Sequence, residues 1–185
     1  MKVIVKNEAK IYKNIYFDKM DAGSLFIYPT DTIYGIGCDA TNESSVHKVR
    51  EAKERMESPF SVIAPSKEWI LENCEVTEDE LEELPGPVTL IVKLKNKDAI
   101  ASNVAPNLDT IGVRIPDHWI SSYVSEYGKP ILTTSVNKVS EPFMTNIEEV
   151  HPDIKGKVHF AINEGIINGR PSKIINLVEK HVIER

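Results

Sequence analysis

The chain has 185 residues, of which 41% are hydrophobic and 27% are charged, and its formal net charge is −6. This length suits one domain with a sizeable core, and the composition excludes the disordered and fibrous classes of protein. The negative charge argues against a broad surface that coats nucleic acid, but it is compatible with a local basic pocket for a phosphate ligand.

The apolar runs and the two cysteines exclude several other classes. TLIVKL, at residues 89–94, is one of the longest apolar runs and is far too short to span a membrane, and the start MKVIVKNEAK is not typical of a signal peptide. We therefore expect a cytoplasmic protein without a membrane segment. Cys38 and Cys74 have no Cys or His partner at metal-ligand spacing, which favours two buried apolar side chains over a disulfide or a zinc site.

Short apolar or alternating runs predict the strands. SLFIY, at residues 24–28, is a continuous apolar run that stops at Pro29, as is typical of a buried strand. TIGVRI, at residues 110–115, is similar but contains Arg114. The other predicted strands cover residues 2–6, 60–64, 85–94 (where a turn comes first), 130–135, 157–162, 173–178 and 181–184.

Helical spacing of apolar residues predicts the segments between the strands. Residues 41–55 are predicted as a helix with Thr41 or Asn42 as its N-cap. Residues 117–128 are predicted as a helix capped by Asp117. The other predicted helices cover residues 14–23, 66–74, 77–84 and 145–151.

The order of these elements indicates the fold class. Strands and helices alternate, no segment repeats at a fixed period, and no low-complexity linker divides the chain. We therefore predict one α/β domain over residues 1–185, built on a mixed sheet.

Polar residues gather where predicted strands and helices end, which is where α/β proteins usually bind ligands. Lys53 and Arg55 converge on one anion only if their helix stops near Lys53, and Pro59 favours such a stop. Arg114 needs a carboxylate or phosphate partner to be buried in its strand. Each polar cluster taken alone is more typical of an ordinary turn. The clusters cover residues 30–34, 53–58, 110–114 and 133–137, together with Ser172.

Six stretches carry a more specific signal through their order and spacing. They are YPTDTIYGIGCDA (28–40), AKERMESPFSVIA (52–64), LPGPVTLIVK (84–93), TIGVRIPDH (110–118), PILTTSVNKVSEPFMT (130–145) and PSKIINL (171–177). Together they resemble the YrdC/Sua5 family of threonylcarbamoyl-adenylate synthases, in its short form with the YrdC-like domain only. The resemblance covers nearly the whole chain. It implies a twisted mixed parallel/antiparallel sheet flanked by helices, with a concave and positively charged pocket.

The resemblance also implies a reaction and its participants. Family members join L-threonine, bicarbonate and ATP into threonylcarbamoyl-AMP, release pyrophosphate, and are assisted by Mg²⁺. A partner enzyme, a threonylcarbamoyl transferase, then moves the threonylcarbamoyl group onto the tRNA adenosine next to the anticodon, so contact between this chain and tRNA is expected to be indirect.

The family's site residues can be carried over where the motifs match. Lys53 and Arg55 match the basic pair that contacts the nucleotide phosphates, and they are the expected catalytic residues. Arg114 would pair with the threonine carboxylate. The resemblance places Thr32, Ser135 and Ser172 with Arg114 at L-threonine, and Ser58, Thr110, Asn137, Thr145 and Arg185 with the basic pair at ATP.

Three departures from the family pattern keep other interpretations open. Met56 stands where the family usually has proline, Val136 replaces the commoner alanine, and Pro171 stands where the family usually has glutamate. Because of these departures, one alternative is a family member that has lost activity. A separate alternative is a non-catalytic RNA-binding protein, against which the net charge of −6 counts. A relative of the carbamoyl-transfer proteins of hydrogenase maturation would need zinc-finger cysteines and an acylphosphatase domain, for which this chain has no room.

Overall fold

The computed structural model describes residues 1–138 and 141–183. Among these residues the strands are β1 (Lys2–Val5), β2 (Phe26–Tyr28), β3 (Gly35–Gly37), β4 (Ser61–Ile63), β5 (Cys74–Glu75), β6 (Val88–Leu94), β7 (Thr110–Arg114), β8 (Ile131–Ser135), β9 (Phe160–Asn163), β10 (Lys173–Asn176) and β11 (His181–Ile183). The helices are α1 (Lys6–Ile11), α2 (Lys13–Asp21), α3 (Glu43–Lys53), α4 (Lys67–Asn73), α5 (Trp119–Tyr127) and α6 (Pro152–Lys157), and single 3₁₀ turns cover Asp79–Leu81, Lys97–Ala99 and Ile147–Glu149.

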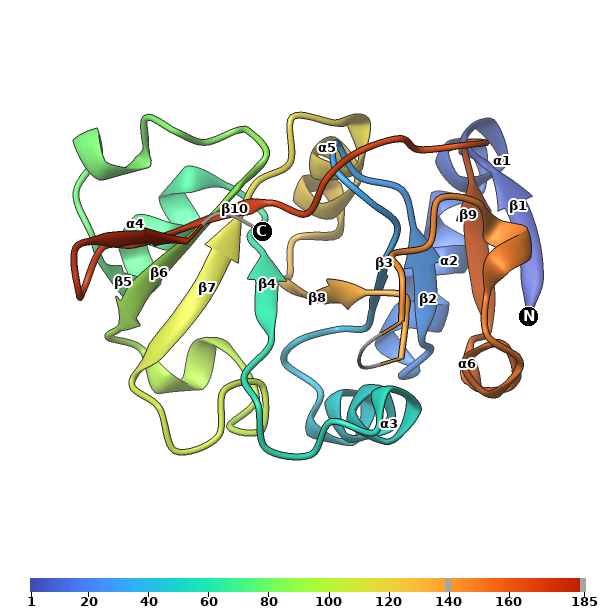
Figure 1. Cartoon of the computed structure of the whole chain (residues 1–185), viewed down its shortest axis with the longest axis horizontal. Coiled ribbons are helices and arrows are strands. Elements are labelled where there is room, and N and C mark those ends of the chain that lie inside the picture. The colour runs from blue at the N-terminus through green and yellow to red at the C-terminus, as the bar shows by residue number, and fades with distance from the viewer. Residues whose placement is uncertain (139–140, 184–185) are drawn as a thin grey trace.

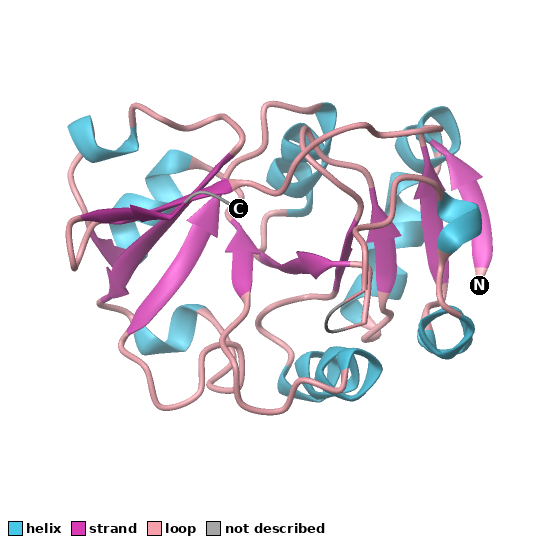
Figure 2. Ribbon diagram, in the orientation of Figure 1, coloured by secondary structure: helices cyan, strands magenta, loops and turns pink. Residues whose placement is uncertain are grey.

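One long, twisted sheet joins these strands in the order β1-β9-β2-β3-β8-β4-β7-β6-β10-β11, and β5 pairs with β6 (Figure 1). The sheet is mixed: β4, for example, pairs in parallel with β7 on one side and antiparallel with β8 on the other. Helices flank the sheet on both sides (Figure 2). The predicted mixed α/β sheet is therefore confirmed.

Strand β2 shows why the sheet is buried on both faces. Successive side chains of a strand point to opposite faces. Accordingly Ile27 belongs to one apolar cluster with Val46 of α3, whereas Phe26 belongs to a second cluster with Met20 of α2 and Ile120 of α5. A strand that contributes to two cores has apolar residues at successive positions. This pattern, in the run SLFIY, is the one from which the strand was predicted.

Helix α3 ends at Lys53, as it must if Lys53 and Arg55 are to converge on one anion. The Asn42 side chain caps its start by accepting a hydrogen bond from the Ser45 backbone N–H at 3.0 Å. The helix ends at Lys53, because Glu54 adopts left-handed backbone geometry with φ of 53°. The prediction that the helix stops near Lys53 is confirmed, so the chain turns between Lys53 and Arg55.

Several sequence predictions about elements were wrong or incomplete. The predicted helix over 77–84 is reduced to the turn Asp79–Leu81, since acidic residues three and four apart repel one another on a helix. The N-cap of α5 is His118, whose Nδ1 accepts from the Ile120 N–H at 3.3 Å, and not Asp117. Helices α1 and α6 and the strands β3 and β5 were not predicted. No helix among the described residues is long and apolar enough to cross a membrane.

The centre of the sheet leaves no room for a side chain at Gly37. A Cβ atom there would lie 2.1 Å from the backbone oxygen of Leu132 on the neighbouring strand, whereas a Cβ at Gly156 in α6 would meet no atom within 4 Å. We expect Gly37→Ala to destabilise the protein by about 1–3 kcal/mol or more through overpacking. Gly156→Ala, as the control, should be neutral or stabilise by up to about 1 kcal/mol. Chemical denaturation of both variants tests this, and equal stabilities would contradict it.

Candidate functional site

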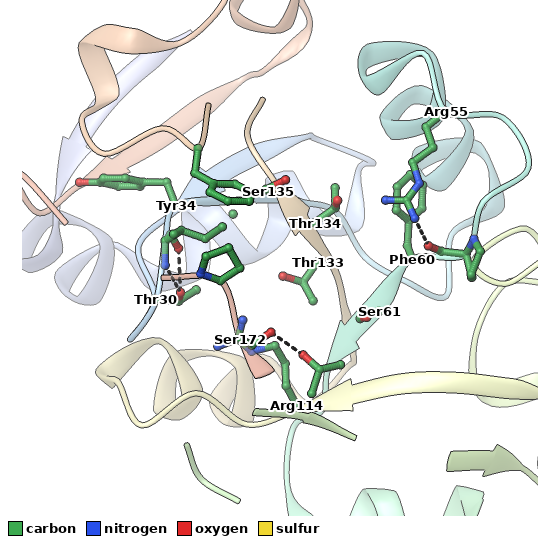
Figure 3. Close-up of a pocket in the computed structure, with 16 residues that line it drawn as sticks. Thr30, Tyr34, Arg55, Phe60, Ser61, Arg114, Thr133, Thr134, Ser135 and Ser172 are labelled. Carbon is green, nitrogen blue, oxygen red and sulfur yellow. Dashed lines mark hydrogen bonds between the residues drawn. The ribbon is translucent and has the colours of Figure 1, made fainter. Parts of the chain in front are cut away.

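A small pocket opens where the middle strands of the sheet meet their connecting loops. It has a volume of about 120 Å³ and is walled mainly by hydroxyl groups and two guanidinium groups (Figure 3). Pockets for drug-sized ligands are about 300–1,000 Å³, so this one suits a small molecule or one part of a larger molecule. The residues that line it are Thr30, Ile33, Tyr34, Gly35, Arg55, Pro59, Phe60, Ser61, Thr89, Arg114, Thr133, Thr134, Ser135, Phe143, Pro171 and Ser172.

A buried ion pair lies at one wall of this pocket. Arg114, the last residue of β7, donates from Nη2 to Oδ1 of Asp31 at 2.6 Å, and the two side chains are only 8% and 9% exposed. The second carboxylate oxygen of Asp31 accepts from the Asp117 backbone N–H at 2.9 Å. Burial raises the pKa of the Asp31 carboxyl, and the guanidinium of Arg114 acts in the opposite direction. The expectation that Arg114 has an anionic partner is confirmed by Asp31.

The hydroxyls of the TDT stretch orient this pair. Thr30 donates to the Ile33 carbonyl at 2.7 Å, so at the 2.9 Å contact between the two threonines the Thr32 hydroxyl is the donor. Thr32 Oγ1 in turn accepts from Nη1 and Nη2 of Arg114, both at 3.4 Å. Thr32 is 2% exposed and lies behind the pocket wall. The stretch thus forms a rigid support for the guanidinium.

Lys53 is a second buried cation, and it is 3% exposed. Its ammonium donates to the backbone carbonyl of Ser135 at 2.6 Å and to that of Asn137. Burial and the nearby Arg55 lower the pKa of Lys53 to about 8. The carbonyl dipoles oppose that shift by favouring the charged form. Lys53 therefore fixes the end of β8 at Ser135, and Asn137 two residues after it, to the end of α3. Both are predicted site residues.

Arg55 lies at the pocket wall itself. Its Nη2 donates to the Pro59 carbonyl at 2.8 Å, and its guanidinium lies 5.1 Å from the centroid of the Phe60 ring. Figure 3 shows the Arg55 side chain on the opposite side of the pocket from Thr30 and Tyr34. One wall of the pocket therefore carries the Arg55 guanidinium, and another carries the Arg114 guanidinium.

Other predicted site residues lie outside this pocket, and their roles stay predictions. Asn137 and Thr145 line a neighbouring cavity of about 400 Å³ that shares Phe143 with the first. Thr110 lies at the opposite end of β7 from Arg114 and lines a separate cavity of about 450 Å³. The Ser58 carbonyl is a hydrogen-bond acceptor, at 3.0 Å from Arg50 Nη1. Arg185 lies outside the described residues.

The sequence did not single out every residue of the site. Asp31 was recognised only as part of a polar stretch, although an acidic residue between two threonines before a glycine-spaced segment could have suggested a partner for Arg114. Ser172 was predicted, but its partner Thr89 on β6, at 2.8 Å between the hydroxyl oxygens, was not. Thr89 stands in an apolar strand, where a single hydroxyl gives no signal of its own.

Comparison with known proteins identifies the family. The model of the Sua5/YciO/YrdC family, described as "Telomere recombination", matches residues 18–185. The chain belongs to this family. The YrdC/Sua5 prediction from the six sequence stretches is thereby confirmed.

Several curated relatives of this Sua5/YciO/YrdC protein are named threonylcarbamoyl-AMP synthase. The chain is 31% identical over 166 residues to the threonylcarbamoyl-AMP synthase of Vibrio campbellii, covering 84% of this chain and 88% of that one. It is 34% identical over 193 residues to the putative threonylcarbamoyl-AMP synthase of Methanocaldococcus jannaschii, covering 99% and 89%. It matches the structure of Pyrococcus abyssi Sua5 complexed with L-threonine with a TM-score of 0.82 and 30% identity, over 96% of this chain and 54% of that one.

The buried ion pair makes stability depend on pH in a testable way when one partner is removed. In Arg114→Met, burial of Asp31 is no longer opposed by a guanidinium, so the folded-state pKa of this carboxyl rises further above its unfolded value. A raised folded pKa means that stability is lost as pH rises from about 4 towards neutrality. We expect a loss of about 3–5 kcal/mol near neutral pH and a smaller one near pH 4. Urea denaturation at both pH values measures this.

Two further variants control this experiment. The double variant Arg114→Met/Asp31→Asn removes both charges and should recover part of the stability at neutral pH. Arg170→Met removes an exposed arginine and should change little. A loss in Arg114→Met that does not vary with pH would show that packing, rather than the uncompensated carboxylate, sets the cost.

Proposed function

We propose that the chain is a threonylcarbamoyl-AMP synthase, a nucleotidyltransferase that converts L-threonine, bicarbonate and ATP into threonylcarbamoyl-AMP and pyrophosphate. The observation that carries the proposal is the hydroxyl-walled pocket with a guanidinium from Arg114 and another from Arg55, in a chain whose relatives bear that name. An enzyme role agrees with these relatives.

The Arg114 side of the pocket suits an amino acid. A free amino acid carries a carboxylate, and the Arg114 guanidinium on the pocket wall offers the complementary charge while Asp31 holds it in place. Ser172 and Ser135 place hydroxyls on the pocket wall that can pair with the hydroxyl of threonine. This assignment agrees with the Pyrococcus abyssi relative, whose structure contains L-threonine.

The Arg55 side suits the phosphates of ATP. Arginine binds phosphate oxygens through two parallel N–H donors, and Lys53 adds a positive charge close behind it. The cavity lined by Asn137 and Thr145 shares Phe143 with this pocket and offers room for the nucleoside. ATP would thus lie across both cavities with its α-phosphate nearest to the amino acid.

Mg²⁺ is proposed to enter with ATP. No group of three or more His, Cys, Asp or Glu side chains suited to a metal ion lies together in the part of the chain that the structure describes. Mg²⁺ binds mainly through substrate phosphates, water and one or two carboxylates, so a dedicated protein cage is not needed. When bound it would neutralise charge on the phosphates.

The reaction needs placement and charge neutralisation more than a covalent nucleophile. The amine nitrogen of threonine takes up the carbon of bicarbonate with loss of water and forms a carbamate. A carbamate oxygen then bonds to the α-phosphorus of ATP, and the bond from this phosphorus to the bridging oxygen of pyrophosphate breaks. Arg55 and Lys53 would stabilise the negative charge of the leaving pyrophosphate. In the proposed next step, a cytoplasmic transferase moves the threonylcarbamoyl group onto tRNA. This chain would therefore contact tRNA only through that partner.

The reaction itself is the first test of this proposal. Purified protein should release pyrophosphate from ATP only when L-threonine and bicarbonate are both present. Omission of either one is the control, and the adenylate product is measured by chromatography. ATP hydrolysis that does not depend on threonine would contradict the assignment, and so would the absence of turnover under every condition.

Amino-acid selectivity tests the proposed role of the hydroxyls. Serine lacks only a methyl group, so its catalytic efficiency should be lower than that of threonine by about 10–200-fold. Valine keeps the shape but leaves the hydroxyls of Ser135 and Ser172 without a partner, and should be rejected more strongly than serine. The measurement is kcat/KM for the three amino acids at saturating ATP and bicarbonate. Equal values for valine and serine would refute the hydroxyl pairing while leaving the reaction intact.

A further inference from the structure

Arg50, in the last turns of α3, is buried without lining the pocket. The residue is 2% exposed. Its guanidinium donates to backbone carbonyls only among the hydrogen bonds of the described residues: those of Asn103 at 2.8 Å, Arg55 at 2.9 Å, Met56 at 2.9 Å, Ser58 at 3.0 Å and Val104 at 3.2 Å. A buried charge is costly unless hydrogen bonds compensate for it, so five carbonyl acceptors are a site built for this one side chain.

The five carbonyls belong to two segments that Arg50 holds together. Three are in the loop 55–58, directly after α3, and two are in the loop 103–104, which comes before β7. The backbone N–H of Phe60 also donates to the Val104 carbonyl, at 2.9 Å. The Arg50 guanidinium lies 4.6 Å from the centroid of the Phe60 ring, which packs against Arg55 as well. The loop is therefore fixed at the turn after α3, along its middle and at its end.

This loop is the pocket wall that carries Arg55. Figure 3 shows Arg55 and Phe60 together at that wall, with Arg55 hydrogen-bonded to Pro59. A flexible loop of this kind would let the Arg55 guanidinium occupy many positions, and a misplacement of about 1 Å in a positioning group is costly for catalysis. Arg50 binds the backbone carbonyls of Arg55 itself and of Met56 and Ser58, which follow it in the chain.

We propose that Arg50 is a positioning residue that holds the Arg55 loop in the geometry that grips the phosphates of ATP; the inference rests on the proposed synthase function. It does not act on the amino-acid side, because Arg114 is held independently by Asp31 and Thr32. The two halves of the pocket are thus supported by separate arginine-centred networks.

Arg50→Lys is the sharpest test because it keeps the positive charge but removes the planar set of N–H donors. Lysine has three ammonium donors at a single point, whereas arginine presents five N–H donors in a planar fork that spans both segments. We expect KM for ATP to rise by about tenfold or more, since one or two charge-assisted hydrogen bonds are lost. KM for L-threonine should stay within about twofold of the wild-type value. Arg50→Met, without any donor, should show a larger rise in KM for ATP.

Lys48→Met is the matched control on the same helix. Lys48 also donates to a backbone carbonyl, that of Gly23 at 3.3 Å, but it does not touch the loop. This variant should leave both KM values unchanged. A rise in the two KM values by the same factor in Arg50→Lys would overturn the proposal, since it would indicate a general loss of structure.

Amide hydrogen exchange separates this inference from the proposed function. Exchange at the hydrogen-bonded amides of Arg55 and Phe60, within the segment 55–60, should accelerate in Arg50→Lys while exchange in β1 and β9 stays unchanged. If the wild-type protein neither binds ATP nor forms product, the synthase assignment fails, and the exchange result still decides whether Arg50 fixes the loop. Unchanged exchange at residues 55–60 would overturn the proposal even in an active enzyme.

Discussion

The site depends on positive charges that are held away from water. Arg50, Lys53 and Arg114 are each buried, with exposures of 2%, 3% and 6%. Removing such groups from water carries a penalty of several kcal/mol each unless hydrogen bonds and counter-charges offset it. Each therefore dictates the polar atoms around it: carbonyls for Arg50 and Lys53, and a carboxylate for Arg114. Some of those atoms come from segments that also wall the pocket, namely the Arg55 loop and the end of β8.

Helix α3 supplies two of these three cations through its last turn. Arg50 and Lys53 are three residues apart, so they leave the helix on nearby faces and reach different segments. Lys53 fastens the end of β8, and Arg50 fastens the loop that carries Arg55. The left-handed residue Glu54 then redirects the chain so that Arg55 reaches the pocket. A single helix end thereby sets the distance between two walls of the site.

Local patterns in the sequence predicted much of this arrangement, and they failed where distant segments meet. The run SLFIY is decided by neighbouring residues and was predicted as a strand, and the cap of α3 was predicted to be Thr41 or Asn42, of which the structure shows Asn42. Arg114 was predicted to need an anion because its own strand is apolar, but the choice of Asp31, 83 positions away, depends on the fold. The importance of Arg50 was invisible for the same reason: its partners are carbonyls, which every residue has.

The cations of the site also explain how a chain with a net negative charge would bind the anionic ligands proposed above. A net charge of −6 repels phosphate at long range, but screening weakens that repulsion beyond about 10 Å at ordinary ionic strength. Within the hydroxyl-lined pocket, the guanidinium groups of Arg55 and Arg114 are much closer to a ligand than the surface carboxylates are, so they contribute more to the local potential. Because the cations are fixed by carbonyls and one carboxylate before any ligand arrives, little reorganisation is needed on binding. The same fixed charges whose burial costs stability would therefore favour binding of the proposed amino acid and nucleotide together.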